Sequence, residues 1–475
     1  MEINYTREEQ FIFQKIGEAA EELNEPAFII GGFVRDKILS RPIKDVDIVV
    51  VGDGIELAKK TAAKFHSKPE VNIFKNFGTA QIKIFLKERL FEIEFVGARK
   101  ESYRSHSRKP DVLPGSIEED TMRRDFTINT LAIGLNKNDY GKLIDPLNAI
   151  TDIENKVLKT PLPPDQTFID DPLRMMRAIR FATQLNFTIE TDTFEAIKKQ
   201  RDRIKIVSPE RIIEELNKIV LAKKPSVGFH LLFISGLLDI IFPQMTELAG
   251  AEFIEGIGHK DNFYHTLQVL DNISLYTGDL WLRWSAILHD IAKPKTKKFE
   301  EGHGWTFHGH EVVGSRMVSK IFAQLKLPLN DKMKFVKKMV MLHMRPISLT
   351  KENITDSAIR RLLFDAGDDI DNLMMLCKAD ITSKNKQKAK RYLDNFEMVE
   401  KRLKEVEESD HLRNWQPPIT GEIIMKEFNL PPSRIVGEIK NAVREAILEG
   451  EIPNQYEEAF GYMKKVASEL GVKNS

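Results

Sequence analysis

The residues from Gly31 to Val51, GGFVRDKILSRPIKDVDIVVV, constrain the fold more than any other stretch of this chain. A short apolar run of strand length precedes Gly31 and Gly32, which allow the backbone to turn tightly with its amides facing outward. Phe33–Ser40 then has the pattern of a short helix, whose N-terminal amides attract anions. We therefore predict a phosphate-binding turn between a strand and a helix, with Arg35 as an added forked cation.

The following strand, Asp45–Val51, begins with Asp45 and Asp47, two positions apart. Because the pleat of a strand points alternate side chains the same way, both carboxylates should face one side. Two hard oxygen ligands beside a phosphate-binding turn suit Mg²⁺, which takes its remaining ligands from water and from a triphosphate. The alternative for each half alone is an ordinary glycine turn, or two solvated carboxylates at the end of a strand.

The combination of GGFVRD with DVD resembles the head domain of the class II nucleotidyltransferases, which are the tRNA CCA-adding enzymes and the bacterial poly(A) polymerases. The resemblance implies an α+β head with a mixed or antiparallel sheet over residues 1–150. Residues 81–86 and 90–96 have the pattern of a β-hairpin that carries Glu92 and Glu94 on one face. The resemblance implies a third metal-binding carboxylate at Glu94, and Glu92 stays an alternative.

Residues 100–120 are polar, charged and interrupted by prolines, a pattern typical of a long loop. The resemblance implies the flexible loop that helps these enzymes move from one nucleotide to the next. The next motif, MRRDFTINTLAI, offers cations and hydrogen-bonding groups to a triphosphate and a ribose, and the family uses its Arg-Arg-Asp motif in this way. The alternative is a capped amphipathic helix with a charged first turn. The residues concerned are Arg123, Arg124, Asp125 and Asn129.

Beyond residue 164 the composition changes to long helical patterns, and we expect the rest of the chain to be all α-helical. In FIDDPLRMMRAIRF, Asp171 and Arg174 lie three apart, as neighbours on one helix face, with Arg177 one turn further. Such a spacing usually means only a surface ion pair. A carboxylate and a guanidinium can also accept cytosine and adenine and reject uracil and guanine, because only the first two present an amine beside a ring acceptor.

This segment matches the family's Glu-Asp-x-x-Arg motif, with Asp170 in place of the glutamate. The resemblance makes residues 151–225 a neck domain that selects the nucleotide. A body or linker over residues 226–255 is expected to follow, and residues 393–475 are expected to form a helical tail.

Histidines and aspartates recur on separate helical segments between residues 256 and 392. Such side chains can converge on one or two divalent transition metals, although a lone helical histidine is more often a core or surface residue. Their order resembles the HD phosphohydrolase domain, which implies metal-activated water attacking a phosphoester, such as a 2',3'-cyclic phosphate on RNA. The alternative is a domain that only grips RNA. The expected ligands are His265, His289, Asp290, His310, His343 and Asp380.

The composition limits the partners and the compartment. Lys+Arg 71 against Asp+Glu 71 gives no net charge, so any RNA contact must come from local basic patches. The single cysteine, Cys377, excludes an internal disulfide and fits a reducing compartment. No signal-peptide pattern and no bilayer-spanning apolar run are present, so we predict a cytoplasmic protein outside the membrane. The basic patches comprise Arg99, Lys100, Arg104, Arg108 and Lys109, and Lys384, Lys386, Lys388, Lys390 and Arg391.

We therefore expect a tRNA nucleotidyltransferase that adds or repairs the 3'-terminal CCA of tRNA from CTP and ATP, with Mg²⁺ in the head and a divalent transition metal in the HD site. A poly(A) polymerase, or an enzyme that adds only A or only CC, would share the head motifs. The residues before the glycine turn lack the basic pair and aromatic residue associated with the poly(A) branch. Two further alternatives are an HD phosphohydrolase with an RNA-binding head and a purely structural RNA-binding protein.

Overall fold

The computed structural model describes residues 3–43, 45–75, 78–102, 111–254, 257–258, 260–349, 355–382, 386–410 and 417–472. The chain divides into two compact units, Met1–Ile241 and Phe242–Ser475. This division falls inside the segment predicted as a body or linker, residues 226–255. The finer division into head, neck, body, HD domain and tail stays a prediction.

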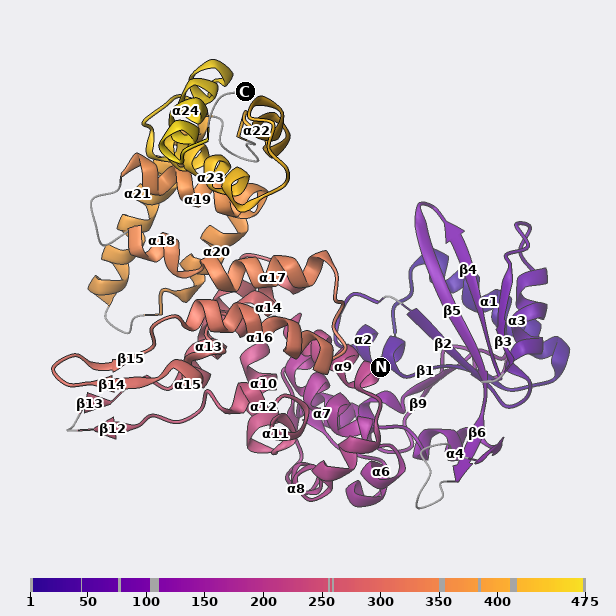
Figure 1. The fold of residues 1–475 in the computed structure, drawn as a ribbon. Helices are drawn as coiled ribbons and strands as arrows, with labels where there is room; N and C mark the ends of the chain where they lie inside the picture. The colour runs from indigo at the N-terminus through magenta and orange to yellow at the C-terminus, as the bar shows by residue number, and fades with distance from the viewer. Residues whose placement is uncertain are drawn as a thin grey trace. The chain divides into compact units, whose positions relative to one another are not determined.

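A seven-stranded sheet in the order β3-β4-β5-β2-β1-β8-β9 forms the centre of the head (Figure 1). β2 and β5 pair in parallel and the other neighbours pair antiparallel, so the predicted mixed sheet is confirmed. The predicted hairpin is also confirmed, because β4 and β5 pair from Thr79↔Val96 to Leu86↔Arg89. The strands are β1 Ala27–Ile30, β2 Asp45–Val50, β3 Val71–Phe74, β4 Thr79–Leu86, β5 Arg89–Gly97, β8 Ala132–Gly134 and β9 Leu143–Ile144.

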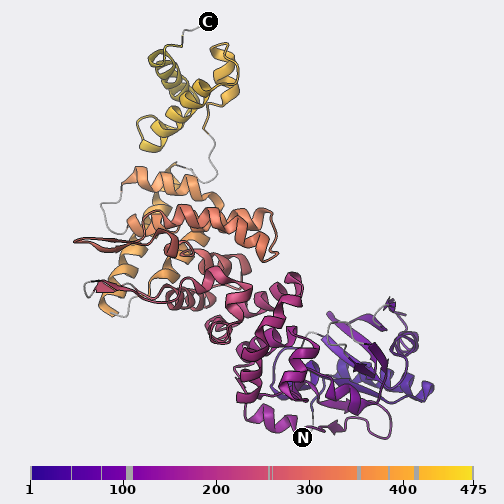
Figure 2. The same cartoon turned by 60° about the horizontal axis from the view of Figure 1, so that its bottom comes forward.

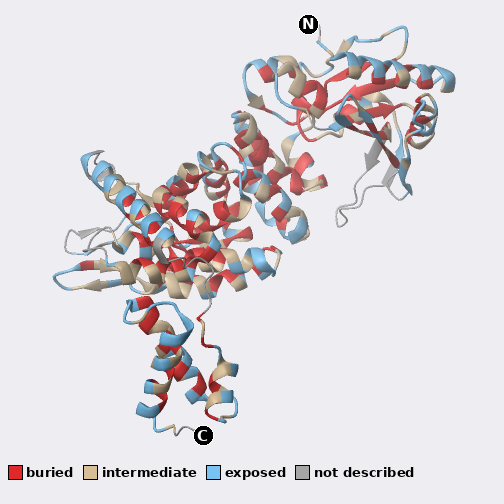
Figure 3. Ribbon diagram, turned by 90° about the horizontal axis from the view of Figure 1, so that it is seen from above, coloured by how far each residue is buried: buried red, intermediate tan, exposed pale blue. Residues whose placement is uncertain are grey.

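Burial follows the side-chain pattern of these strands. All of β1 is buried, whereas β2 begins with an exposed Asp45, a buried Val46 and a half-buried Asp47 before it enters the core. In Figure 3 the buried residues follow the strands of the head and the inner faces of the helices. The carboxylates of β2 therefore lie on a face of the sheet that side chains leave partly open. The head also contains helices α1 Arg7–Leu23, α2 Gly32–Ile38 and α3 Gly54–Ala63.

The prediction of a long loop over residues 100–120 is wrong for the parts that the structure describes. β6 (Arg99–Ser102) pairs antiparallel with β7 (Asp111–Pro114), and α4 (Ile117–Met122) follows. α4 begins there because Ser116 and Glu119 form a reciprocal capping box. Residues 103–110, which include the predicted basic residues Arg104, Arg108 and Lys109, lie outside the described residues.

The rest of the first unit is mainly helical, as predicted, with one departure. β10 (Val157–Leu158) and β11 (Thr188–Ile189) pair in parallel, because β-branched residues at both places favour extended backbone. The remaining elements are η2 Thr127–Asn129, α5 Ala149–Glu154, α6 Pro164–Asp170, α7 Leu173–Leu185, α8 Thr191–Gln200, η3 Arg201–Ile206, α9 Pro209–Val220, α10 Pro225–Ile234 and α11 Leu237–Ile241.

The second unit is a helical assembly with two short hairpins, which correct the all-α expectation there as well. β12 (Phe253–Ile254) pairs with β13 (Ile257–Gly258), and β14 (Lys298–Glu300) pairs with β15 (Gly304–Thr306). Both hairpins project from the helices in two views (Figures 1 and 2). The helices are α12 Pro243–Thr246, α13 Asn262–Ser274, α14 Leu280–Leu288, α15 Lys293–Thr296, α16 His310–Gln324, α17 Asp331–Leu342, α18 Met344–Leu349, α19 Asp356–Ala366, η4 Gly367–Asp369, α20 Ile370–Asp380, α21 Lys386–Asp410, α22 Gly421–Glu427, α23 Arg434–Glu449 and α24 Tyr456–Glu469.

The last three helices, α22, α23 and α24, share a core of their own. Buried apolar residues from all three pack together there. Among them are Ile424, Ile439, Val443 and Met463.

Candidate active site and candidate metal centre

Parallel pairing of β2 with β5 brings four carboxylates to one face of the head sheet. Asp47 stands in register with Glu94, and Asp45 with Glu92. Residues in register on neighbouring strands project to the same side, and so do residues two apart on one strand. The four carboxylates therefore lie at the corners of a square on one face. Two further observations distinguish the surroundings of Glu92 and Glu94.

Glu92 is hydrogen-bonded to a lysine, whereas the pKa of Glu94 is raised by the neighbouring aspartates. Lys83 donates to Glu92 across the hairpin at 2.8 Å. Burial raises the pKa of Glu94, and the negative charges of Asp47 and Asp45 raise it further. Burial likewise raises the pKa of Asp47, although the guanidiniums of Arg124 and Arg177 act in the opposite direction. A divalent cation would relieve this repulsion, so the donor set fits a hard metal ion.

The glycine turn lies against this acidic face. Gly31 has φ 77° and ψ −126°, a conformation that a residue with a side chain rarely adopts. A Cβ there would lie 3.2 Å from Arg124 Nη1 and 4.0 Å from Asp47 Oδ2. The turn therefore leaves room for the guanidinium and the carboxylate beside it. The Gly31 amide donates to the Leu131 carbonyl, so it does not face outward as predicted. A Cβ on Gly32, the first residue of α2, would lie 3.7 Å from Arg35 Nη2, an ordinary van der Waals distance.

Arg35 is buried and bonded to protein groups. Its Nη1 donates to Asn129 Oδ1 at 2.7 Å, and its Nε and Nη2 donate to both oxygens of Asp36. Asn129 donates in turn to Asp125 Oδ1 at 2.9 Å, and Arg177 donates to Asp125 Oδ2. A buried polar chain therefore runs from α2, where Arg35 lies, to α7, where Arg177 lies. The predicted contact of Arg35 with a phosphate stays a prediction.

Asp125 is the charged centre of this chain. Burial alone would raise its pKa, but Arg177, Asn129 and Arg174 outweigh burial and hold the pKa well below its usual value. Arg177 bonds it through two nitrogens, at 2.8 and 2.6 Å. Asp125 is therefore an anion that fixes the position of Arg177.

Sequence reasoning missed Asp120, which organises the Arg-Arg pair. Its side chain is fully buried, and both arginines donate to it: Arg123 to Oδ1 at 2.9 and 2.6 Å, and Arg124 to Oδ2 at 3.2 and 3.0 Å. The signal was present, since residues three and four apart on a helix meet on one face. The shared carboxylate sets the spacing of the two guanidiniums.

The structure corrects the expected placement of Asp171. It does not share a helix face with Arg174, because it precedes Pro172 and is extended, at φ −136° and ψ 99°, between α6 and α7. Its Oδ1 accepts from the Leu173 amide at 3.2 Å, and its Oδ2 lies 3.7 Å from Arg211 Nη2. Arg174 is the second residue of α7 and donates to the Arg123 carbonyl. Asp171 therefore lies just before α7, and Arg174 lies in its first turn.

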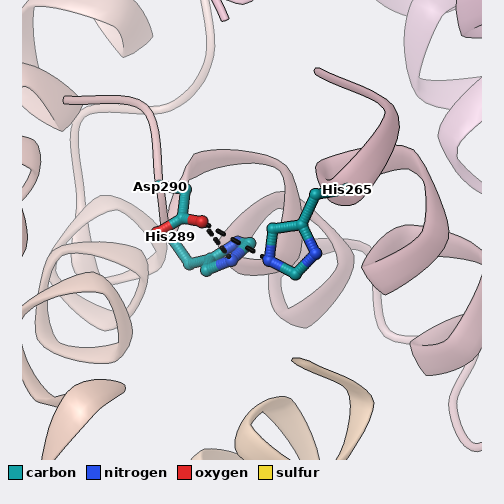
Figure 4. A group of neighbouring side chains, drawn as sticks. All are labelled: His265, His289 and Asp290. Atoms are coloured by element: carbon teal, nitrogen blue, oxygen red, sulfur yellow. Dashed lines mark ion pairs between the residues drawn. The ribbon is translucent and has the colours of Figure 1, made fainter. Parts of the chain in front are cut away.

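The second unit brings all six predicted HD residues together: His265, His310 and Asp380 lie on α13, α16 and α20, His289 and Asp290 directly follow α14, and His343 directly follows α17. Figure 4 shows the carboxylate of Asp290 facing the imidazoles of both His265 and His289. Asp290 Oδ2 lies 3.5 and 3.2 Å from their Nε2 atoms, and Asp290 Oδ1 lies 3.3 and 3.9 Å from those of His310 and His343. Asp380 Oδ1 lies 2.9 Å from His265 Nε2 and 3.6 Å from His289 Nε2.

These atoms form two overlapping sets of possible metal ligands. One comprises His265, His289 and Asp290, and the other comprises Asp290, His310 and His343. Asp290 contributes one oxygen to each set, a geometry suited to a carboxylate between two cations. Nε2 of His289 is buried and makes no hydrogen bond, as expected of an atom that coordinates a metal.

Electrostatics in this cluster favour a cation. Burial alone would lower the pKa of His289, but the carboxylates of Asp290 and Asp380 outweigh it and raise the pKa to about 10. Burial lowers the pKa of His343 to about 4, so this imidazole is neutral at pH 7 and retains a lone pair. Imidazoles and carboxylates together suit a divalent transition metal.

Three models of known protein families match this chain, in the same order as the sites described above. Residues 27–159 match the poly A polymerase head domain, residues 186–248 match the probable RNA and SrmB-binding site of polymerase A, and residues 262–384 match the HD domain. No helix in the described parts of the chain is both long and apolar enough to cross a membrane.

Three curated relatives extend the comparison. An A-adding tRNA nucleotidyltransferase of Deinococcus radiodurans is 30% identical over 75% of this chain and 81% of its own length. A multifunctional CCA protein of Pseudomonas fluorescens is 32% identical over 63% of this chain and 70% of its own length. An A-adding tRNA nucleotidyltransferase of Aquifex aeolicus is 43% identical over 36% of this chain, a match that spans only 20% of that longer protein.

A solved tRNA nucleotidyltransferase, complexed with a primer tRNA and an incoming ATP analog, has a similar structure with a TM-score of 0.56 and 25% identity. The match covers 81% of this chain and 99% of that one. Sequence and structure thus agree over most of the molecule, and the chain belongs to the tRNA nucleotidyltransferase family, as an enzyme with a poly A polymerase head and an HD domain.

Proposed function

We propose that the head adds nucleotides from CTP and ATP to the 3' end of tRNA and so builds or repairs the terminal CCA. The observation that carries the proposal is the register of Asp47 with Glu94 beside the Gly31 turn and Arg124. Burial and Asp45 raise the pKa of Asp47 there, and burial and the two aspartates raise the pKa of Glu94, beside a glycine turn and a guanidinium. This combination suits a metal-bound triphosphate.

In this proposal Asp45, Asp47 and Glu94 hold Mg²⁺, which would activate the primer 3'-hydroxyl and stabilise the departing pyrophosphate. Arg123 and Arg124, spaced by Asp120, orient the triphosphate, with the turn at Gly31 and Gly32 leaving room for it. Arg35, Asn129 and Asp125 act mainly by holding Arg177, and Asp125 also lies where a ribose hydroxyl could bind.

Base selection is assigned to the start of α7. Asp171 accepts from the exocyclic amine of cytosine or adenine, and Arg174 donates to the adjacent ring acceptor. Arg211 near Asp171 and the Arg123 carbonyl bonded to Arg174 hold the two side chains in place. Uracil and guanine present a carbonyl instead of the amine and are rejected.

A second candidate is addition of A alone, because two of the relatives, from Deinococcus radiodurans and Aquifex aeolicus, bear the name A-adding tRNA nucleotidyltransferase. The name multifunctional CCA protein for the Pseudomonas fluorescens relative supports full CCA addition. A tRNA substrate together with the single buried cysteine supports a cytoplasmic location.

For the second unit we propose a divalent transition-metal centre held by His265, His289, Asp290, His310, His343 and Asp380. The bound metal would supply an activated water for hydrolysis of a phosphoester at an RNA end. The buried Nε2 of His289 and the shared carboxylate of Asp290 support a metal-binding role rather than a purely structural one.

The experiment that tests the proposal is extension of a labelled tRNA without its CCA end, resolved on a sequencing gel. The tRNA receives CTP alone, ATP alone or both. Growth by two nucleotides with CTP, and by a third only when ATP is present, would establish CCA addition. Extension only of a tRNA that already ends in CC would establish the A-adding candidate, and long ladders with ATP alone would contradict both.

Two matched variants test the carboxylate assignment in the same assay. Glu94→Gln removes the acid that stands in register with Asp47, and we expect addition to fall on the order of 100-fold. Glu92→Gln changes an acid of the same strand face that is already bonded to Lys83, and we expect addition to stay within a few-fold of wild type. Equal losses in both variants would contradict the choice of Glu94.

A further inference from the structure

The histidines of the metal centre differ in what they bond through Nδ1. In His289, His310 and His343, Nδ1 lies 2.8, 2.8 and 2.7 Å from the backbone carbonyls of Ala286, Phe307 and Val340. A carbonyl can only accept, so Nδ1 of each ring carries a proton, and in the neutral imidazole the lone pair lies on Nε2. His310 Nε2 and His343 Nε2 lie 3.2 Å apart, so they share one proton in the absence of a metal. Nε2 is therefore the atom that each of these three rings offers to a metal once its proton has left.

His265 has two neighbours of opposite character at Nδ1. Lys260 Nζ lies 2.8 Å away and Thr382 Oγ1 lies 3.0 Å away. An ammonium can only donate, so contact with Lys260 makes Nδ1 an acceptor and leaves the proton on Nε2. That proton faces Asp380 Oδ1 at 2.9 Å, and this tautomer has no lone pair for a metal at Nε2.

Thr382 suits the other tautomer. A hydroxyl accepts as well as donates, so Thr382 Oγ1 can accept from a protonated Nδ1 and leave Nε2 free to bind a metal. Lys260 Nζ also lies 2.6 Å from Thr382 Oγ1, and the lysine is exposed. The ammonium can therefore move away from Nδ1 while it remains bonded to the hydroxyl or to water.

We propose that Lys260 and Thr382 compete for His265 Nδ1, and that the outcome sets the affinity of the centre for its metal. Lys260 opposes loading because it stabilises the tautomer that cannot bind. Thr382 is a positioning residue that stabilises the tautomer that can. The inference rests on the proposed metal centre and concerns the ligand set His265, His289, Asp290 and Asp380.

The competition predicts opposite effects of two small substitutions, each on the full-length protein. Lys260→Met keeps the length of the side chain but cannot donate, whereas Thr382→Val keeps the shape but cannot accept. A matched control is Lys297→Met, because Lys297 contacts Glu252 and the ring of Trp305. The measurement is a Co²⁺ titration of metal-free protein, read by calorimetry and by the visible absorption of bound Co²⁺. Excess Mg²⁺ occupies the oxygen ligands of the head.

We expect Lys260→Met to bind Co²⁺ on the order of 10-fold more tightly than wild type and Thr382→Val on the order of 10-fold more weakly, as is usual for residues that orient a ligand. Lys297→Met should bind like wild type. If Thr382→Val binds as well as wild type, Lys260 acts through its charge alone and the competition is refuted. An unchanged affinity in Lys260→Met refutes it too. Absence of Co²⁺ binding in every protein, wild type included, would instead overturn the proposed metal centre.

Discussion

Asp47 is a charged residue in a place that disfavours its charge. Burial raises its pKa, and Asp45 adds to the rise, while Arg124 and Arg177 oppose it. The ordinary value, 3.8, applies to the unfolded chain. Because the folded state holds the proton more tightly, the free energy of unfolding falls as the pH rises from 3.8 through the raised pKa. The residue therefore costs stability at neutral pH in the absence of metal.

Asp47→Asn should lower the rate of nucleotide addition and raise the stability of the metal-free protein. Nucleotide addition should fall on the order of 1000-fold, because a charged ligand is lost. In metal-free buffer at pH 7 the variant should melt at a higher temperature than wild type, and the difference should vanish near pH 3, where the carboxyl is protonated in both states. Thermal unfolding at the two pH values checks this. A lower melting temperature at pH 7 would show that Asp47 stabilises the fold.

Much of this site could be predicted from local spacing, but not all of it. The strand pleat placed Asp45 and Asp47 correctly on one face. The placement of Asp171 on a helix face was wrong, since Pro172 forces its backbone out of the helical region. The pairing of Asp120 with Arg123 and Arg124 follows from their helical spacing, but the full burial of Asp120 depends on packing that local sequence does not express.

Among the elements, the β4–β5 hairpin has a two-residue turn in which both residues have a positive φ, which is strained for residues with side chains. Lys87 and Glu88 lie between the paired residues Leu86 and Arg89 and have φ of 43° and 67°. A two-residue turn with positive φ at both positions usually contains Asn-Gly. Lys87-Glu88 is not a recognisable turn sequence, so alternation along the two strands alone indicated the hairpin.

Replacing Lys87-Glu88 by Asn-Gly should therefore stabilise the first unit by about 1 kcal/mol, because these residues adopt the left-handed region more readily. Loss of the exposed pair between Lys87 and Glu8 should offset little of this gain. Urea unfolding measures the change, and Ala-Ala at the same positions is the control that should destabilise. A loss of stability with Asn-Gly would contradict the strain argument.

The helix that carries Arg174 and Arg177 is anchored by a buried ion pair. Arg180 of α7 donates to Glu215 of α9, and its guanidinium lies 3.8 Å from the centre of the Phe181 ring. Both charged side chains are largely buried. The pair fixes α7 against α9 and hence fixes the side chains at the start of α7.

Glu215→Ala should cost about 3 kcal/mol, because it leaves the Arg180 charge buried without its partner. The double variant Arg180→Met with Glu215→Leu should recover most of that loss, since apolar residues of similar volume replace the pair. Thermal unfolding of the wild type and both variants provides the comparison. A double variant no more stable than Glu215→Ala would show that the pair contributes more than it costs.

At the scale of the whole molecule, two compact units carry separate sites. The acids of the head lie in Met1–Ile241, and the HD cluster lies in Phe242–Ser475. Helical patterns in the sequence predicted that the chain beyond residue 164 is mainly helical, but strands of two or three residues, such as β10 to β15, are too short to show a period. The division at residue 241 depends on how helices pack and was not visible in the composition.

Asp290→Asn should separate the two sites. It removes the carboxylate common to both ligand sets, so Co²⁺ binding by the second unit and any phosphoester hydrolysis should be lost. Nucleotide addition to tRNA should stay within a few-fold of wild type. Gel extension and Co²⁺ titration on one preparation measure both, and a large loss of addition would show that the HD cluster takes part in the head reaction.

The parallel pairing of Val157–Leu158 with Thr188–Ile189 has a consequence for how such enzymes diversify. The pairing joins the two ends of the segment that contains α6 and α7, which places those ends one strand spacing apart, about 5 Å. Because the ends lie so close together, the segment can be exchanged for that of a relative while the two strands stay in place, provided that its partners elsewhere in the unit, such as Glu215, match it. Under the base selection proposed for Asp171 and Arg174, transplanting these roughly thirty residues should transfer the nucleotide preference and leave Asp45, Asp47 and Glu94 unchanged.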